Sequence, residues 1–293
     1  MRKLMLVFAT LMVMLAVTVV PAGAITGNFV EDFQHPFVGL VVFYDESGEF
    51  SHRCSGSLLS PSVFLTAGHC TEGVSTARVY FQQDAGANFD PVTEIDPVTG
   101  YPEFCADGTL GVTCATSDEL YTFGTPFASF PNTRDVGLVI LDQPISLSEY
   151  GKLAAAGSLD RLATRRGKQE VTFTVSGYGV SRINPVQFES FRERLMAEVK
   201  LVNLSNALTS GFNLQTSANP GGGRGGTCFG DSGGPIFYGG FSSNTIVAVT
   251  SFGLNANCRG VDFSYRTDQE AVIEWILDHA PADERNLIQI VPI

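Results

Sequence analysis

Three short motifs carry side chains that together can perform nucleophilic catalysis. Ser232 lies in the segment 226–235, which reads Gly-Thr-Cys-Phe-Gly-Asp-Ser-Gly-Gly-Pro. His69 follows Leu-Thr-Ala-Gly, and Asp135 precedes the apolar run Val136–Leu141. A serine hydroxyl becomes an effective nucleophile when a neighbouring base accepts its proton, and a third group orients that base. The three motifs therefore indicate acyl transfer through Ser232.

The glycines around Ser232 support this interpretation. Gly230 and Gly233 allow a sharp turn, which brings main-chain N–H groups close to a substrate carbonyl. The alternative is an ordinary surface turn, because Gly, Asp, Ser and Pro are common in turns. The histidine and aspartate motifs decide between the two, since a surface turn requires neither.

The chain order His, Asp, Ser, with these local sequences, resembles the chymotrypsin/trypsin family of serine endopeptidases. The resemblance implies that His69 is the general base, Asp135 orients it, and Ser232 is the nucleophile. The N–H groups of Gly230 and Ser232 would form the oxyanion hole. Gly68 stands where alanine is more usual in the family, a change for which the sequence suggests no chemical loss.

The expected fold is all-β. Short β-branched and aromatic runs, separated by Gly, Pro, Asn and Ser, predict strands at 37–44, 63–66, 77–82, 136–141, 171–176, 196–201, 236–238 and 245–252. The resemblance implies two six-stranded antiparallel β-barrels with the active site between them. We expect the first at about 25–150, the second at about 160–265, and a join within 147–162.

A C-terminal helix at about 267–280 completes the expected architecture. Thr267-Asp268-Gln269-Glu270 has the form of a capping box, and an apolar helical face follows it. Its predicted role is packing.

The N-terminal segment 1–24 reads as a secretory signal peptide. Arg2 and Lys3 precede an apolar run, and Ala22-Gly23-Ala24 offers a small-residue cleavage pattern. An uncleaved membrane anchor is the alternative, at the lower length limit for a spanning helix. Cleavage would leave a trypsin-like domain at 25–293, secreted to an extracellular or periplasmic location, with no membrane contact after signal removal.

Cleavage after Ala24 would give a new amino terminus at Ile25. The resemblance implies that this α-ammonium folds inward and pairs with Asp231, because a buried carboxylate is costly unless it is paired. We hypothesise that signal peptidase makes the activating terminus directly, without a separate propeptide.

Composition limits the partners. The chain has 44% apolar and 16% charged residues, enough to fill a core, and its net charge is −12. A nucleic-acid partner is therefore not expected. The expected partners are a protein or peptide substrate and a proteinaceous inhibitor, and the expected state is a monomer.

Six cysteines in an exported chain suggest three disulfides, and spacing alone permits fifteen pairings. The resemblance implies the pairs Cys54 with Cys70 and Cys228 with Cys258, which leaves Cys105 with Cys114. No Cys-x-x-Cys occurs. We therefore expect neither a catalytic metal nor a cofactor.

Seven residues are expected at the primary specificity pocket. The resemblance places Gly226, Ser251, Phe252, Gly253 and Gly260 there, Thr227 follows Gly226, and Asp262 lies two residues after Gly260, from where it could reach the pocket floor. An uncharged Gly226 at the base predicts a bulky apolar or aromatic substrate residue before the scissile bond. Asp262 is the alternative determinant and would select Arg or Lys. A carboxylate in a dry pocket needs a cation or a proton.

Two stretches depart from a compact barrel. Segment 83–133 is long and polar, and we expect a solvated insertion that forms one wall of the cleft, with calcium binding left open. The glycine run 221–226 is expected to lead flexibly into the nucleophile turn.

The sequence fits two other functions less well. A lipase or esterase would place its serine first in the triad order and in a Gly-x-Ser-x-Gly turn. A binding protein of the same fold that has lost turnover usually lacks a triad residue, and here all three are present.

Overall fold

The computed structural model describes residues 25–85, 93, 95, 105, 113–163, 170–184, 187–190, 193–217, 219 and 223–293. The predicted signal peptide, most of 86–112 and part of the glycine run lie outside these residues. Within the described residues, no helix has the length and apolar character needed to cross a membrane.

The first barrel uses seven strands: β3 (Val38–Tyr44), β4 (Phe50–Leu58), β5 (Val63–Thr66), β6 (Thr76–Tyr80), β7 (Cys114–Ser117), β8 (Glu119–Thr122) and β9 (Gly137–Ile140). Their order is β7-β6-β3-β4-β5-β9-β8, and each pair is antiparallel. Only Asp118 separates β7 from β8, and these two strands lie at opposite ends of that order. The stretch 114–122 therefore bends once and nearly closes the barrel.

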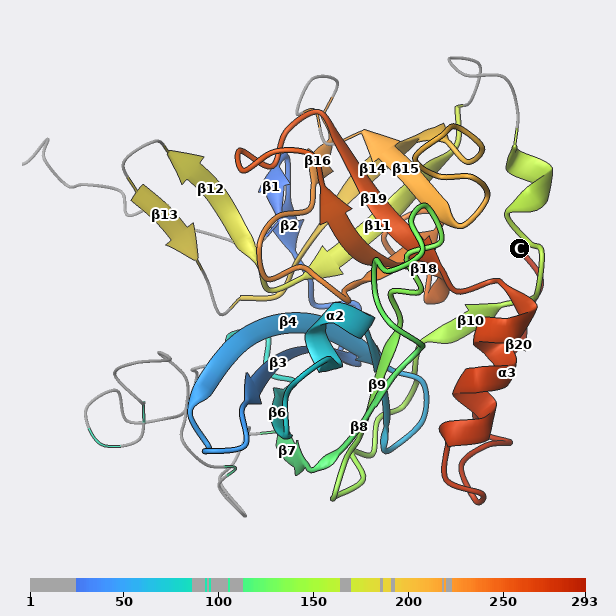
Figure 1. The fold of residues 1–293 in the computed structure, drawn as a ribbon. Coiled ribbons are helices and arrows are strands. Elements are labelled where there is room, and N and C mark those ends of the chain that lie inside the picture. The colour runs from blue at the N-terminus through green and yellow to red at the C-terminus, as the bar shows by residue number, and fades with distance from the viewer. Residues whose placement is uncertain are drawn as a thin grey trace, which may run out of the picture.

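The second barrel is a closed ring of six antiparallel strands: β11 (Thr172–Gly177), β14 (Leu195–Asn203), β15 (Asn213–Ser217), β17 (Pro235–Tyr238), β18 (Thr245–Gly253) and β19 (Val261–Arg266). Figure 1 shows the two barrels as separate lobes with α2 (Gly68–Thr71) between them. The predicted all-β, two-barrel fold is confirmed, except that the first barrel has seven strands because one of them is split at Asp118.

Five short strands and a hairpin extend this framework. Strand β1 (Thr26–Gly27) pairs with β16 (Gly225–Gly226), and β2 (Val30–Glu31) pairs with β14. Strand β10 (Lys152–Ala154) pairs in parallel with both β18 and β20 (Ile290–Val291). Strands β12 (Val180–Asn184) and β13 (Gln187–Ser190) form the hairpin.

Buried aromatic and aliphatic side chains hold the strands together. Every residue of β3 except Tyr44 is buried, and the core cluster that contains β3 also includes Tyr178, Phe237 and Tyr265 of the second half. Burial of apolar area contributes about 25 cal/mol per Å². The core of the first barrel therefore continues into the second half and fixes the cleft, while the second barrel also has a cluster of its own around Phe173 and Val199.

Three short helices are present among the described residues: α2, the 3₁₀ turn η1 (Asp160–Leu162) and α3 (Glu270–His279). The predicted capping box does not form, because the N-cap of α3 is Gln269 and has no side-chain cap bond. Thr267, whose hydroxyl would have capped the helix, instead donates its N–H to the Val247 carbonyl of β18 at 3.0 Å, and its hydroxyl has no partner among the described residues. The next residue, Asp268, accepts hydrogen bonds from the Leu159 N–H and the Arg266 guanidinium.

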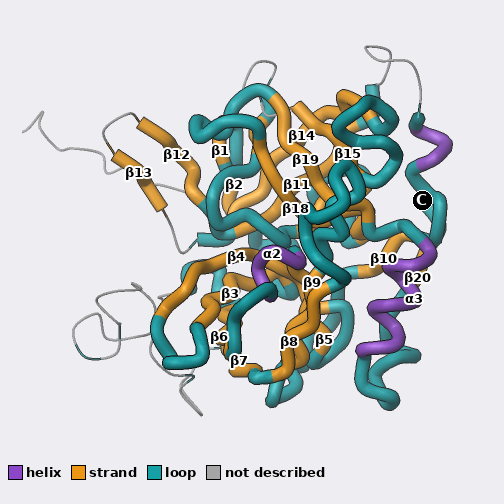
Figure 2. Tube along the Cα trace, in the orientation of Figure 1, coloured by secondary structure: helices purple, strands orange, loops and turns teal. Residues whose placement is uncertain are grey.

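Helix α3 packs against the first barrel, although it follows the second in the chain. The Trp275 ring lies 5.3 Å from the Phe123 ring, and the His279 ring lies 4.5 Å from the Tyr121 ring. Figure 2 shows α3 at the side of the molecule near β10 and β20. Glu284, beyond the helix, accepts a hydrogen bond from the Ser62 N–H of the first barrel at 2.9 Å. The C-terminal segment thus contacts both barrels.

Candidate active site

Pairing of β5 with β9 brings His69 and Asp135 together. Thr66 lies opposite Gly137 in this register, so the segments that follow β5 and precede β9 are adjacent. The His69 N–H donates to Asp135 Oδ1 at 2.8 Å, and His69 Nδ1 lies 2.9 Å from Asp135 Oδ2. Asp135 is fully buried, whereas the His69 side chain is 29% exposed. A buried carboxylate that holds Nδ1 leaves Nε2 free to face the cleft.

The second barrel also contacts Asp135. Ser251, in β18, donates a hydrogen bond from its hydroxyl to Asp135 Oδ2. The carboxylate therefore has a donor from each barrel, and its position depends on how the two barrels are docked.

Ser232 lies in a tight turn that both barrels hold. Gly230 and Gly233 have φ values of +93° and +77°, a region that favours glycine. The Ser232 carbonyl accepts from the Ser55 N–H of β4 at 2.8 Å, and the Gly233 N–H donates to the Thr250 carbonyl at 2.7 Å. The turn is thus anchored to strands on both sides of the cleft.

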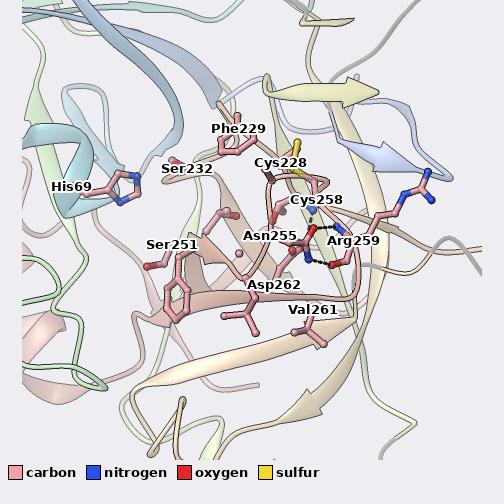
Figure 3. Close-up of a pocket in the computed structure, with 16 residues that line it drawn as sticks. His69, Cys228, Phe229, Ser232, Ser251, Asn255, Cys258, Arg259, Val261 and Asp262 are labelled. Carbon is pink, nitrogen blue, oxygen red and sulfur yellow. Dashed lines mark hydrogen bonds between the residues drawn. A yellow bond between two sulfur atoms is a disulfide. The ribbon is translucent and has the colours of Figure 1, made fainter. Parts of the chain in front are cut away.

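A cavity of about 480 Å³ opens between Ser232 and His69 and extends into the second barrel. Figure 3 shows these two residues together at one end of it. Of the seven predicted pocket residues, five line the cavity: Thr227, Ser251, Phe252, Gly253 and Asp262. Gly226 and Gly260 lie outside the lining, because Gly226 pairs with Thr26 in a short ladder and Gly260 turns the chain at φ +98°.

Asp262 is a buried carboxylate in the wall of this cavity. Its Oδ2 accepts a hydrogen bond from the Thr227 N–H at 2.7 Å, and the residue is 3% exposed. Burial raises the pKa of Asp262 to about 6, against the opposing effect of the bonds from Thr227.

Asp231, next to the serine, is fully buried and accepts from the N–H groups of Gly179 and Cys228 at 2.9 and 2.8 Å. Ile25 is also fully buried, and its main-chain nitrogen donates to Asp231. Burial raises the pKa of Asp231 to about 7, and the negative charge of Asp262 adds to the increase. The site would accommodate a cation beside Asp231.

The structure contains three disulfides, Cys54–Cys70, Cys105–Cys114 and Cys228–Cys258. The first joins β4 to α2, and the third borders the cavity. One group of metal-ligand residue types occurs among the described residues, His52 with Cys54 and Cys70, but its sulfurs form a disulfide and are not free thiolates.

Several residues of the site were not predicted from the sequence. Phe127 lies with its ring 6.0 Å from the His69 ring and 5.8 Å from the Phe252 ring. Phe229 and Leu254 line the cavity, and each is 55% exposed. Phe229 had one available signal, since it is a large apolar residue between the cysteine and the glycine of the nucleophile motif.

Gly68 has a steric role that the sequence did not show. A Cβ at this position would lie 3.0 Å from Pro126 Cγ and 3.0 Å from the Val136 carbonyl. Absence of the methyl group therefore lets the segment that carries Phe127 approach α2.

Comparisons with known proteins agree with this geometry. The family profile described as Trypsin matches residues 25–276. Brachyurin from Leptuca pugilator is 28% identical over 76% of this chain and 85% of its own length. Chymotrypsin-like elastase family member 3B from Homo sapiens is 26% identical over 80% of each chain.

Solved structures share the fold. HL collagenase superposes with a TM-score of 0.62 at 17% identity, covering 87% of this chain and 97% of its own. The scabies mite inactivated protease paralogue S-D1 superposes with a TM-score of 0.59 at 16% identity, covering 87% of this chain and 97% of its own. With the family profile spanning both barrels and the relatives being proteases, the chain belongs to the trypsin family of serine endopeptidases.

Proposed function

We propose that this chain is an exported endopeptidase in which Ser232 attacks a peptide carbonyl. His69 takes the serine proton and later returns it to the leaving amine, and Asp135 orients His69 and stabilises its imidazolium. The observation that carries the proposal is the 2.9 Å contact between His69 Nδ1 and the buried Asp135, in a histidine that shares one cavity with Ser232.

The N–H groups of Gly230 and Ser232 supply the oxyanion hole in this proposal. The left-handed conformation of Gly230 and the two anchors of the turn support it, because preorganised donors stabilise developing negative charge without reorganisation. An acyl-enzyme forms, and water then hydrolyses it.

The proposed substrate carries a bulky apolar or aromatic residue before the scissile bond. The cavity volume and the apolar rim of Phe229 and Leu254 support this preference. Asp262 supports a second candidate preference, Arg or Lys, because its carboxylate lines the same cavity. The family implies that the substrates are proteins or peptides. The proposed enzyme is a monomer, and a proteinaceous inhibitor can block it.

Export and maturation belong to the same proposal. Removal of residues 1–24 would release the chain to the extracellular space or periplasm and expose the α-ammonium of Ile25. Contact of the Ile25 nitrogen with Asp231 supports the ion pair at this site. Amino-terminal sequencing of the exported protein tests it, and a mature terminus several residues from Ile25 would contradict it.

Cleavage of a mixed peptide library by the protein that begins at Ile25, and by its Ser232→Ala variant, tests the catalytic assignment. The variant should lose on the order of 10⁴-fold or more in turnover. The matched control is Ser57→Ala, which removes a buried hydroxyl with no hydrogen-bond partner among the described residues. Near-full activity in Ser232→Ala would refute the assignment.

The alternative is a binding protein that retains the fold without turnover. The similarity to a mite paralogue described as inactivated motivates it. Absence of any cleavage by a protein that begins at Ile25, with intact folding, would favour this function.

A further inference from the structure

We propose that Asn213 and Tyr265, two buried residues of the second barrel, are positioning residues for Asp135. They hold the segment that precedes Asp135, so that its carboxylate stays directed at His69. The inference rests on the proposed endopeptidase function and concerns the same site. Ser251 contacts the carboxylate of Asp135 directly, whereas Asn213 and Tyr265 act through the chain that leads to it.

Asn213 and Tyr265 form one polar pair. They lie directly opposite each other on β15 and β19, and their exposed fractions are 0% and 1%. Side chains that are directly opposite in an antiparallel ladder project from the same face of the sheet. In Figure 1 the segment between β8 and β9, drawn in green, rises from the first barrel towards the strands of the second. The polar pair lies where this segment meets the second barrel.

Three hydrogen bonds join the polar pair to the segment 131–133. Asn213 Nδ2 donates to the Pro131 carbonyl at 2.8 Å, and Asn213 Oδ1 accepts from the Thr133 hydroxyl at 3.2 Å. The Tyr265 hydroxyl donates to Asn132 Oδ1 at 2.7 Å. Burial raises the pKa of Tyr265 to about 12, so this hydroxyl remains a donor at neutral pH. Three consecutive residues of the first half are thus held by side chains of the second barrel.

A residue in a strained conformation separates this segment from Asp135. Arg134 has a φ of +46°, in the left-handed region that residues with a Cβ rarely adopt. Such a conformation persists only where the surrounding structure fixes it. On the C-terminal side the chain is fixed by the pairing of Gly137 with Thr66, and on the N-terminal side by the polar pair. The polar pair therefore maintains the direction in which the chain enters Asp135.

This direction matters because His69 contacts Asp135 at two points. The His69 N–H donates to Oδ1 at 2.8 Å, and Nδ1 lies 2.9 Å from Oδ2. If Arg134 relaxed to an ordinary φ, the carboxylate would turn and these contacts would lengthen. Neither Asn213 nor Tyr265 lines the cavity, so substrate binding would change little. We therefore expect a loss in kcat with little change in KM.

Two substitutions remove the proposed contacts in steps. Tyr265→Phe removes only the bond to Asn132 and should lower kcat about tenfold, and Asn213→Ala removes the other two bonds and should lower it about 100-fold. KM should stay within about twofold of the parent value. The control Tyr238→Phe removes the same hydroxyl from a tyrosine of β17 that does not line the cavity, and it should leave kcat unchanged. Unchanged kcat in both Tyr265→Phe and Asn213→Ala would overturn the proposal.

A second substitution distinguishes positioning from packing. Glycine adopts a left-handed φ without strain, so Arg134→Gly should recover about tenfold of the kcat that Asn213→Ala loses. Arg134→Ala removes the same guanidinium but keeps a Cβ, and it should recover none. Equal kcat in the two double variants would show that Asn213 contributes to packing alone, and would overturn the role proposed for it.

A spectroscopic measurement tests the proposal without turnover. Proton NMR on Ser232→Ala would follow the His69 Nδ1 proton, which a short charge-assisted hydrogen bond to Asp135 shifts downfield. Either substitution of the polar pair should move this resonance upfield, and the control substitution should not. An unmoved resonance would overturn the proposal. A resonance that moves as expected, in a protein whose parent cleaves no peptide, would support the positioning role and count against the endopeptidase function.

Discussion

The Ser55 hydroxyl of the first barrel donates a hydrogen bond to the Gly230 carbonyl of the nucleophile turn at 2.8 Å. The same hydroxyl accepts from the Tyr178 N–H at 2.9 Å. Together with the bond from the Ser55 N–H to the Ser232 carbonyl, these contacts make Ser55 a positioning residue for the turn that carries the proposed oxyanion hole.

Ser55→Ala should therefore lower kcat about tenfold with little change in KM, because misplaced oxyanion donors affect the transition state more than the bound substrate. Steady-state kinetics with one peptide substrate measures both parameters. Ser57→Ala on the same strand should retain full activity, since its hydroxyl has no partner among the described residues. Equal effects of the two substitutions would mean that Ser55 only contributes to packing.

Gly68→Ala should disturb the segment that carries Phe127. The new methyl group would lie 3.0 Å from Pro126 Cγ and from the Val136 carbonyl, and overpacking costs about 1–3 kcal/mol. We expect a lower free energy of unfolding in urea and a higher KM. Gly240→Ala is the control, because a Cβ there meets no atom within 4 Å. Unchanged stability and KM in Gly68→Ala would show that the segment adjusts without cost.

An N-terminal extension should make stability depend on pH through Asp231. Burial raises the pKa of Asp231 to about 7 when the Ile25 nitrogen is an uncharged amide, against 3.8 for an ordinary aspartate. The unfolded state then binds fewer protons than the folded state between these values, so stability falls as pH rises from about 4 to about 7. The slope approaches about 1.4 kcal/mol per pH unit.

The comparison pairs the protein that begins at Ile25 with one that keeps an extra alanine before it. Thermal unfolding between pH 4 and pH 8 should show a steeper loss for the extended protein, since an α-ammonium paired with Asp231 would lower the raised pKa. Identical profiles would argue against the ion pair. Asp262 changes the pH dependence of stability equally in both proteins, so its effect cancels in the difference between their two profiles.

A separate buried pair, Asp32 with His35, predicts sensitivity to acid. His35 Nδ1 lies 2.8 Å from Asp32 Oδ2, and the Ser176 hydroxyl donates to the same oxygen at 2.6 Å. Burial alone would raise the pKa of Asp32, but the hydrogen bond and charge of His35 hold it below its usual value. A carboxyl with a lowered pKa stabilises the fold above pH 4, and that contribution is lost as pH falls below it.

Asp32→Asn should accordingly reduce the free energy of unfolding by about 3 kcal/mol at pH 7, because it leaves His35 without its buried partner. Urea denaturation at pH 7 and at pH 3 checks this, and the difference between variant and parent should shrink at pH 3. Asp283→Asn should match the parent at both values. A variant as stable as the parent at pH 7 would show that the pair contributes no net stability.

The amino-acid sequence by itself determined much of the fold. The eight predicted strands all lie within or overlap observed strands, because alternating and continuous apolar runs bounded by turn residues specify strands locally. The His69, Asp135 and Ser232 motifs were recognisable because each depends on its own short segment. Five barrel strands were missed, namely β4, β7, β8, β15 and β19, since polar residues such as His52, Glu119 and Asp262 interrupt their apolar patterns.

Tertiary structure alone decided the contacts between distant segments. The capping box before α3 failed because Thr267 continues the pairing of β19 with β18, where its N–H donates to the Val247 carbonyl, and the helix begins only after Gln269. Ser55 reaches Gly230 across 175 positions, and the burial of Asp262 depends on the closed ring of six strands. Local sequence patterns indicate strand propensity and turn chemistry. The burial and the hydrogen-bond partners of a side chain depend on which strands pair, and these two properties set the pKa of a carboxylate.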